Sequence, residues 1–354
     1  MAETTYRNRR AVQIENEQVR VTVMVEGGHI AEILDKQTGV NPLWTPPWPS
    51  IEPSLYDRAK HPAYGADAES KLLAGIMGHN LCLDIFGGVS PEEAAAGLTV
   101  HGEASIAAYE IFSSEAALTM RATFPHAQLA FTRSIELDGD KIVIGETVEN
   151  LTATDRPVGW TQHVTVGPPF LEAGRTQFDA PCTKSKVYEG EFGVGGYMKT
   201  AAEFDWPMVP TKNGGAADLR IYSAEPVSSG YTAHLMDPAQ DISYFSAWSP
   251  THNVLFGYVW KRADFPWLGV WEENHSRASP PWNGQALTRG MEFGVSPMPE
   301  TRRQMIDRGS MFGVPGYRWI PARGKVSVGY YAFIRSASGI GAGPAIERGG
   351  PFPA

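Results

Sequence analysis

Apolar and polar residues alternate with period two in much of the chain. In 12–14 and 19–25, valine and isoleucine occupy every second position, and polar side chains such as Arg20 and Thr22 lie between them. Successive side chains of a β-strand point to opposite faces, so this spacing is typical of strands and not of helices. The pattern predicts two strands joined by a hairpin at residues 16–18.

The same alternation recurs to the end of the chain, and helical patterns are rare. Further strands are predicted at 118–124, 131–137, 141–148, 254–260 and 326–333. Short helices are predicted at 67–77 and 91–96, the second beginning with Pro91. Because strands and helices do not alternate regularly, a parallel α/β fold is disfavoured, and we expect an all-β sandwich with few short helices.

The sequence shows no convincing linker between domains. We therefore expect a single domain over residues 1–335. Residues 336–354 contain five glycines and three prolines and show no strand pattern. This C-terminal tail is expected to be extended or disordered.

Composition and charge exclude several kinds of partner. The 354 residues include 39 acidic and 30 basic side chains, a net charge of −9, with no cluster of Lys and Arg. Nucleic-acid binding is therefore disfavoured, and no apolar run is long enough for a membrane span. The two cysteines, Cys82 and Cys182, suit a reducing compartment. We expect a cytoplasmic monomer or homodimer.

Aromatic and histidine residues indicate the candidate chemistry. Ten tryptophans lie mostly near turns, where an indole can stack on a sugar and offer its N–H to a hydroxyl. His101 lies where an apolar run meets a turn, and His163 lies within a short strand pattern. Histidine exchanges a proton near neutral pH, so both are candidates for acid–base work or for a structural role. His79 and Asn80 are weaker candidates for substrate contact.

A dense polar and aromatic cluster follows the apolar strand pattern that begins at Trp267. The strand ends in Glu272 and Glu273, flanked by Trp271 and Arg277. Adjacent strand residues face opposite ways, so only one of the two carboxylates can enter a pocket. The sequence does not show which one does.

Four blocks of the sequence together resemble the galactose mutarotase-like superfamily. They are residues 16–44, with a Gly-Gly turn; residues 78–87 with the following His101-Gly102; residues 160–170 around His163; and residues 269–272, which end in Glu272. The resemblance covers roughly residues 10–335. It implies a β-supersandwich, two large twisted antiparallel sheets with a sugar lying across one concave face.

In the aldose 1-epimerases of this superfamily, a histidine acts on the ring oxygen and a glutamate on the anomeric hydroxyl. The resemblance therefore implies His163 as acid, Glu272 as base and His101 as a substrate contact, with no metal or organic cofactor. Two departures indicate a divergent branch. An arginine expected near residues 78–81 is missing, and Val-Thr-Val-Gly-Pro-Pro-Phe follows His163.

Three functions remain open at this stage. The first is mutarotation of a free sugar or sugar derivative by His163 and Glu272, with His79, Asn80, His101, Trp271 and Arg277 contacting the sugar. The second is a carbohydrate-binding protein without catalysis on the same scaffold. The third is a sugar lyase or hydrolase using a metal held by His79, His101, His163 and a carboxylate.

Overall fold

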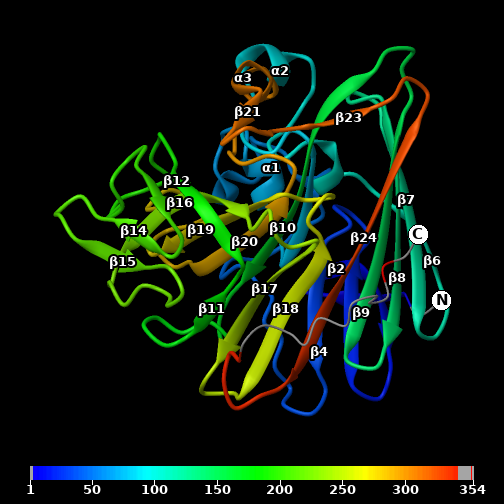
Figure 1. Cartoon of the computed structure of the whole chain (residues 1–354). Coiled ribbons are helices and arrows are strands. Elements are labelled where there is room, and N and C mark those ends of the chain that lie inside the picture. The colour runs from blue at the N-terminus through cyan, green and yellow to red at the C-terminus, as the bar shows by residue number, and fades with distance from the viewer. Residues whose placement is uncertain (1–2, 342–351, 353–354) are drawn as a thin grey trace.

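The computed structural model describes residues 3–341 and residue 352, and its main feature is a pair of large antiparallel β-sheets packed face to face (Figure 1). In the described residues the larger sheet has twelve strands. Along this sheet the order is β1 (Glu3–Tyr6), β2 (Arg9–Glu15), β3 (Val19–Met24), β4 (Ile30–Asp35), β5 (His79–Asp84), β10 (Arg156–Val166), β20 (Leu287–Gly294), β19 (Trp267–Asn274), β16 (Ser228–Met236), β12 (Cys182–Val187) and β13 (Glu203–Asp205), with β23 (Arg318–Ile320) pairing on β10.

The second sheet has eight strands in the described part of the chain. Its order is β11 (Gln177–Asp179), β17 (Ile242–Ser249), β18 (Val254–Lys261), β24 (Lys325–Ser336), β9 (Lys141–Asn150), β8 (Leu129–Asp138), β7 (Ala117–Phe124) and β6 (Glu110–Ser113). Two small pairs are separate, β14 (Met208–Pro210) with β15 (Ala216–Asp218) and β21 (Ser310–Met311) with β22 (Val314–Pro315). The predicted all-β architecture with two large antiparallel sheets is confirmed.

Helices are short and lie in the connections. They are α1 (Ser70–Leu73), α2 (Pro91–Ala95) and α3 (Arg302–Arg308), with single 3-10 turns at Pro53–Leu55, Pro62–Tyr64 and Glu103–Ser105. The helix predicted at 67–77 is reduced to α1. The helix ends in a turn at residues 74–75, where a Cβ on Gly75 would lie 2.8 Å from a Pro53 side-chain carbon. No helix in the described residues is long and apolar enough to cross a membrane.

The predicted N-terminal hairpin is formed by β2 and β3. Val12 pairs with Val23, and Ile14 pairs with Val21. The Asn16 side chain accepts hydrogen bonds from the backbone N–H groups of Gln18 and Val19, at 2.9 and 2.8 Å, and so closes the turn.

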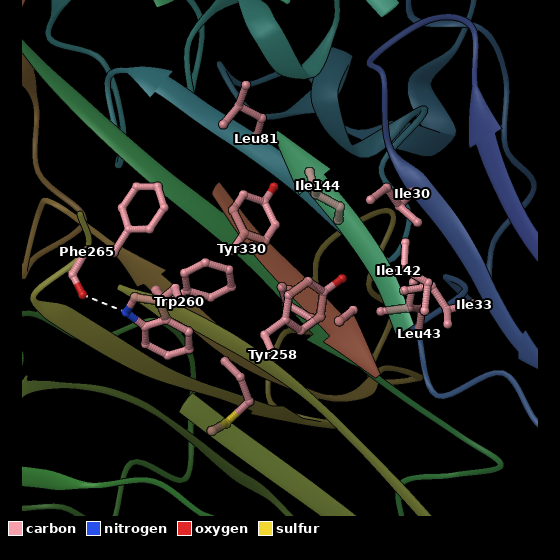
Figure 2. Close-up of a cluster of buried hydrophobic side chains, with 14 of the residues drawn as sticks. Ile30, Ile33, Leu43, Leu81, Ile142, Ile144, Tyr258, Trp260, Phe265 and Tyr330 are labelled. Atoms are coloured by element: carbon pink, nitrogen blue, oxygen red, sulfur yellow. Dashed lines mark hydrogen bonds between the residues drawn. The ribbon is translucent and has the colours of Figure 1, made fainter. Parts of the chain in front are cut away.

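The hydrophobic core lies between the two sheets (Figure 2). Leu81 of β5 and Ile30 of β4 meet Ile142 and Ile144 of β9, all at most 1 % exposed. This is the burial that the period-two pattern of the strands predicts, because each strand places alternate side chains between the sheets.

A buried polar network crosses this core. Glu146 of β9 accepts hydrogen bonds from Arg133 Nε (2.8 Å), Trp160 Nε1 (2.9 Å), Gln162 Nε2 (2.6 Å) and the Tyr330 hydroxyl (2.7 Å). Trp160 and Gln162 reach Glu146 from the larger sheet, and Arg133 and Tyr330 reach it from its own sheet, so the buried carboxylate is paired, which is the condition for burying a charge at acceptable cost.

The boundary of the domain at residue 335 stays a prediction. β24 ends at Ser336, and most of the tail that was expected to be extended or disordered, 342–351 and 353–354, lies outside the described residues.

Candidate functional site

One row of side chains crosses four adjacent strands on the face of the larger sheet that lies away from the core. Asn80 of β5 pairs with His163 of β10, His163 pairs with Glu292 of β20, and Glu292 pairs with Gly269 of β19. The residues next to them along each strand, among them Leu81 and Phe293, enter the core between the sheets. Because side chains alternate, the row itself points to the opposite face.

The central feature of this row is a histidine beside a carboxylate. Nε2 of His163 lies 3.1 Å from Oε1 of Glu292, and both side chains are almost fully buried. Their orientation does not meet the angles of a hydrogen bond, and Oε1 has no other partner among the described residues. Nδ1 of His163 is paired with the Thr165 hydroxyl at 3.0 Å, which fixes the ring. The pair therefore keeps hydrogen-bonding capacity for a ligand.

Glycines make room for these side chains. A Cβ on Gly290 would collide with Oε1 of Glu292, and one on Gly269 would collide with the hydroxyl of Tyr231. Neither glycine has a positive φ, so the reason for glycine at both positions is space and not backbone strain.

His101 reaches the same place from the loop after α2. Its Nδ1–H donates to the Phe86 carbonyl at 2.5 Å, so Nε2 is left as an acceptor. Its ring meets that of His163 edge to face, with the centroids 5.1 Å apart. The backbone of His101 has φ 63°, a left-handed conformation that is uncommon for a residue with a side chain and that aims the ring at His163.

A cavity of about 630 Å³, part of it open to solvent, adjoins the two histidines. Its walls are largely aromatic and apolar. The lining residues include Phe86, Phe192, Tyr231, Trp271 and Trp282 together with His101, His163 and Glu292. The indole Nε1 of Trp271 is buried and has no acceptor among the described residues. Buried polar groups are rarely left unpaired, so this donor and Glu292 Oε1 together mark a place for a polar ligand.

Arg277 lines the rim of the cavity. Its guanidinium lies 4.6 Å from the ring centre of Trp282, and its Nε donates to the Phe192 carbonyl at 3.0 Å. The Glu273 carboxylate accepts hydrogen bonds from the turn that carries this arginine, from Ser276 N (2.7 Å), Ser276 Oγ (2.6 Å) and Arg277 N (3.1 Å). Glu273 therefore orders the turn that carries Arg277.

Burial sets the protonation of the central pair. Desolvation lowers the pKa of His163 well below its usual 6.5, and the neighbouring His101 lowers it further. Desolvation likewise raises the pKa of Glu292 well above its usual 4.5. Burial lowers the pKa of His101 to about 4, against the opposing effect of the Phe86 carbonyl. Both shifts favour the uncharged forms, neutral His163 beside protonated Glu292, so the pair shares one titrating proton.

Four of the residues expected at the site, His101, His163, Trp271 and Arg277, line this cavity. Asn80 is the neighbour of His163 in the row, buried, with its Nδ2 unpaired among the described residues, but it does not line the cavity.

Glu272 is not brought to His163. Trp271 faces the cavity, so Glu272 points to the other side of the sheet. There its Oε2 accepts a hydrogen bond from Arg289 Nη2 at 3.0 Å, and its Oε1 accepts one from Ser228 Oγ. The structure thus differs from the expectation that Glu272 is the partner of His163, because the parity of the strand places it on the opposite face.

His79 also lies away from the cavity. It is fully buried between the sheets, where Nδ1 pairs with the Tyr258 hydroxyl and Nε2 with Gln162 Oε1, both at 2.9 Å. It is adjacent to Asn80 in β5, so the two side chains leave opposite faces of the sheet. The expected sugar contact from His79 is not formed, and its hydrogen bonds belong to the core.

The same separation affects the expected metal-ligand set. His79 lies on the opposite face of the sheet from His101 and His163. In residues 3–341 and 352, no three His, Cys, Asp or Glu side chains are grouped as a metal site would require. The set of His79, His101, His163 and a carboxylate is therefore not assembled.

Glu292 is the residue that sequence reasoning missed. It lies in the stretch Gly290-Met-Glu-Phe-Gly294, which has glycine two positions before and two positions after the carboxylate. In a strand these three residues share one face, so the glycines leave open space around the glutamate. This pattern is the signal that could have identified it.

Comparisons with known proteins agree with this architecture. No protein-family model and no curated protein sequence matches the chain. Solved structures do match it. A galactose mutarotase related enzyme from Lactobacillus acidophilus is 12 % identical, with TM-score 0.59, over 93 % of this chain and 98 % of that one. A galactose mutarotase-like protein from Clostridium acetobutylicum is 13 % identical, with TM-score 0.58, over 94 % and 98 %. A Synechocystis protein is 14 % identical, with TM-score 0.61, over 95 % and 100 %.

The chain therefore has the galactose mutarotase-like fold, and the resemblance noted in its sequence is confirmed at the level of structure. At 12–14 % identity the likeness concerns the fold alone.

Proposed function

We propose that the protein is a carbohydrate-active enzyme that interconverts the anomers of an aldose, with His163 and Glu292 as the proton-transfer pair. The observation that carries the proposal is the 3.1 Å approach of His163 Nε2 to Glu292 Oε1 beside an aromatic cavity. The aromatic walls suit the C–H face of a sugar ring, and the free indole N–H of Trp271 suits a hydroxyl.

The chemistry needs one proton donor and one proton acceptor. Mutarotation removes the proton of the C1 hydroxyl and protonates the ring oxygen, so the bond between C1 and the ring oxygen breaks and an open-chain aldehyde forms. Rotation about the C1–C2 bond then allows the ring to close on the other face of the carbonyl. A buried pair that shares one titrating proton supplies both groups: in ring opening the protonated member donates to the ring oxygen and the other member accepts the proton of the C1 hydroxyl. Ring closure returns both protons, so each complete turnover restores the pair.

His101 supports this step without donating a proton. Its Nδ1–H is occupied by the Phe86 carbonyl, and its lowered pKa keeps Nε2 unprotonated at neutral pH. It is therefore an acceptor for a sugar hydroxyl.

The test is the rate of anomer exchange. Freshly dissolved α-D-glucose and α-D-galactose are followed by polarimetry with the wild type, His163→Gln and Glu292→Gln. A general acid or base contributes roughly 10²–10⁴-fold, so each variant should lose most of the enzyme-dependent rate. Exposed residues provide matched controls, His126→Gln and Glu203→Gln, which should keep it.

A second outcome defines the alternative. Calorimetric binding of a sugar, with anomer exchange no faster than the uncatalysed rate, would indicate a carbohydrate-binding protein on the same scaffold. Wild-type rates in both His163→Gln and Glu292→Gln would reject the proposed pair.

A further inference from the structure

We propose that Arg277 binds an anionic group of the sugar, a phosphate or a carboxylate, and that Glu69 occupies the position of this anion in the free protein. The inference rests on the proposed function and adds the substrate class. It follows from the way in which Arg277 is held at the rim of the cavity.

One edge of the guanidinium is fixed by the protein. Nε donates to the Phe192 carbonyl at 3.0 Å and lies 3.4 Å from Glu273 Oε2. Glu273 is itself engaged by three hydrogen bonds of the turn at Ser276 and Arg277, so it cannot move with the arginine. The position of the guanidinium is therefore set before any ligand arrives.

The faces of the guanidinium are covered by aromatic rings. The ring centres of Trp282, Trp271 and Phe192 lie 4.6, 5.7 and 5.7 Å from the central carbon of Arg277. This packing leaves 15 % of the side chain exposed. A planar guanidinium held between rings presents its free edge in a fixed direction, the arrangement that favours two-point binding of carboxylate or phosphate oxygens.

The remaining edge is held only loosely. Nη1 lies 3.4 Å from Glu69 Oε2, at the long limit of a hydrogen bond, and the Glu69 side chain is 42 % exposed. No other residue in the described part of the chain accepts a hydrogen bond from either Nη atom. A long ion pair with a solvent-exposed carboxylate contributes little, so a ligand anion can replace it.

The charge of the cavity fits this exchange. Of its lining residues, Arg277 is the single lysine or arginine, and Glu69 and Glu292 are the acids. Burial raises the pKa of Glu292 well above its usual 4.5, which favours the uncharged form of this carboxyl. When a ligand carboxylate displaces Glu69, one negative charge replaces another beside Arg277, and a phosphate brings up to about one more. Glu69 then moves into solvent.

The experiment measures binding by calorimetry at low ionic strength. The ligands are D-glucose, D-glucose 6-phosphate and D-glucuronate, and the corresponding D-galactose series. At least one anionic ligand should bind the wild type about 10–100-fold more tightly than its neutral parent, the range expected for charge-assisted hydrogen bonds. The tighter of the two anions identifies phosphate or carboxylate as the group.

Three variants separate the roles. Arg277→Gln should remove the preference for the anion, so that the anionic ligand binds no more tightly than its neutral parent. Glu69→Gln, on an exposed side chain that should not affect folding, should strengthen anion binding by a few fold, because the competing carboxylate is gone. Arg303→Gln, on a side chain that is 88 % exposed, is the matched control and should change nothing.

The outcomes distinguish this inference from the proposed function. Equal binding of neutral and anionic sugars by the wild type, or an unchanged preference in both Arg277→Gln and Glu69→Gln, overturns the inference. If neutral sugars are interconverted but anions bind no better, the inference fails and the proposed function stands. If anions bind through Arg277 without anomer exchange, the inference stands and the proposed function fails.

Discussion

Replacement of Glu272 by glutamine tests whether this carboxylate is structural. Glu272 and Arg289 form an ion pair at 3.0 Å, with side chains 2 % and 1 % exposed. Arg289 also donates to the Leu219 carbonyl at 2.8 Å and packs over the ring of Tyr222. Glutamine keeps the shape of the side chain but leaves the arginine charge buried without its counter-charge.

The expected cost follows from this burial. Removing one partner of a buried ion pair destabilises a protein by about 3–5 kcal/mol. Unfolding entropy of about 2.1 cal/mol/K per residue, applied to a chain of 354 residues, converts this loss to a fall in Tm of about 4–7 °C. Because Glu272 does not reach the cavity, the anomer-exchange rate well below Tm should stay within a few fold of the wild type.

The assay combines calorimetric melting with polarimetry on the same preparations. The double variant Glu272→Met/Arg289→Met should lose less stability than the sum of the two single variants, because no unpaired charge remains. An unchanged Tm for Glu272→Gln, or a loss of activity without a loss of stability, would refute the reasoning.

Three further changes have defined outcomes. His79→Leu leaves the buried Tyr258 hydroxyl without its partner, whereas Gln162 Oε1 keeps its hydrogen bond from the Tyr330 hydroxyl, so urea unfolding should show a loss of about 1–3 kcal/mol with the exchange rate retained. Gly290→Ala puts a Cβ against Glu292 Oε1 and should lower the exchange rate at least tenfold in polarimetry, whereas Gly339→Ala, with no heavy atom near its Cβ position, should not. Because the folded pKa of Glu292 is raised, the wild type loses stability as pH rises above about 4.5 towards that folded pKa. The stability gained by Glu292→Gln, measured by urea unfolding, should therefore increase with pH, by at most about 1.4 kcal/mol per unit, and a constant difference would contradict the assigned shift. The folded pKa of His101 is about 4, so the stability contributed by its neutral form is lost as pH falls from about 6.5 to 4. In His101→Gln the free energy of unfolding, measured with urea, should therefore fall less over this pH range than in the wild type.

The strands were predictable because their pattern is local. In β2 and β3 one face is buried in the core, and Asn16 supplies the hydrogen bonds of the turn, so the hairpin follows from a few neighbouring residues. The helix predicted at 67–77 was too long. The chain packs closely against Pro53 at Gly75, and a local pattern of apolar residues does not show a contact with a more distant residue.

The faces of the site strands were not predictable. In β5 and β19 every residue is buried, because both faces of the larger sheet are covered there. Alternation shows that Trp271 and Glu272 face opposite ways, but it does not show which of them enters the cavity. For the same reason His79 and Asn80 could not be assigned to faces. Glu292 reaches His163 through strand pairing alone, which a single sequence does not reveal.

The most direct measurement of the central claim is a double-mutant cycle on the anomer-exchange rate. If His163 and Glu292 act as one proton-transfer unit, His163→Gln/Glu292→Gln should be no slower than the slower single variant, because the unit is already lost in each. Exchange rates that fall independently, with the double variant showing the product of the two single effects, would contradict the account.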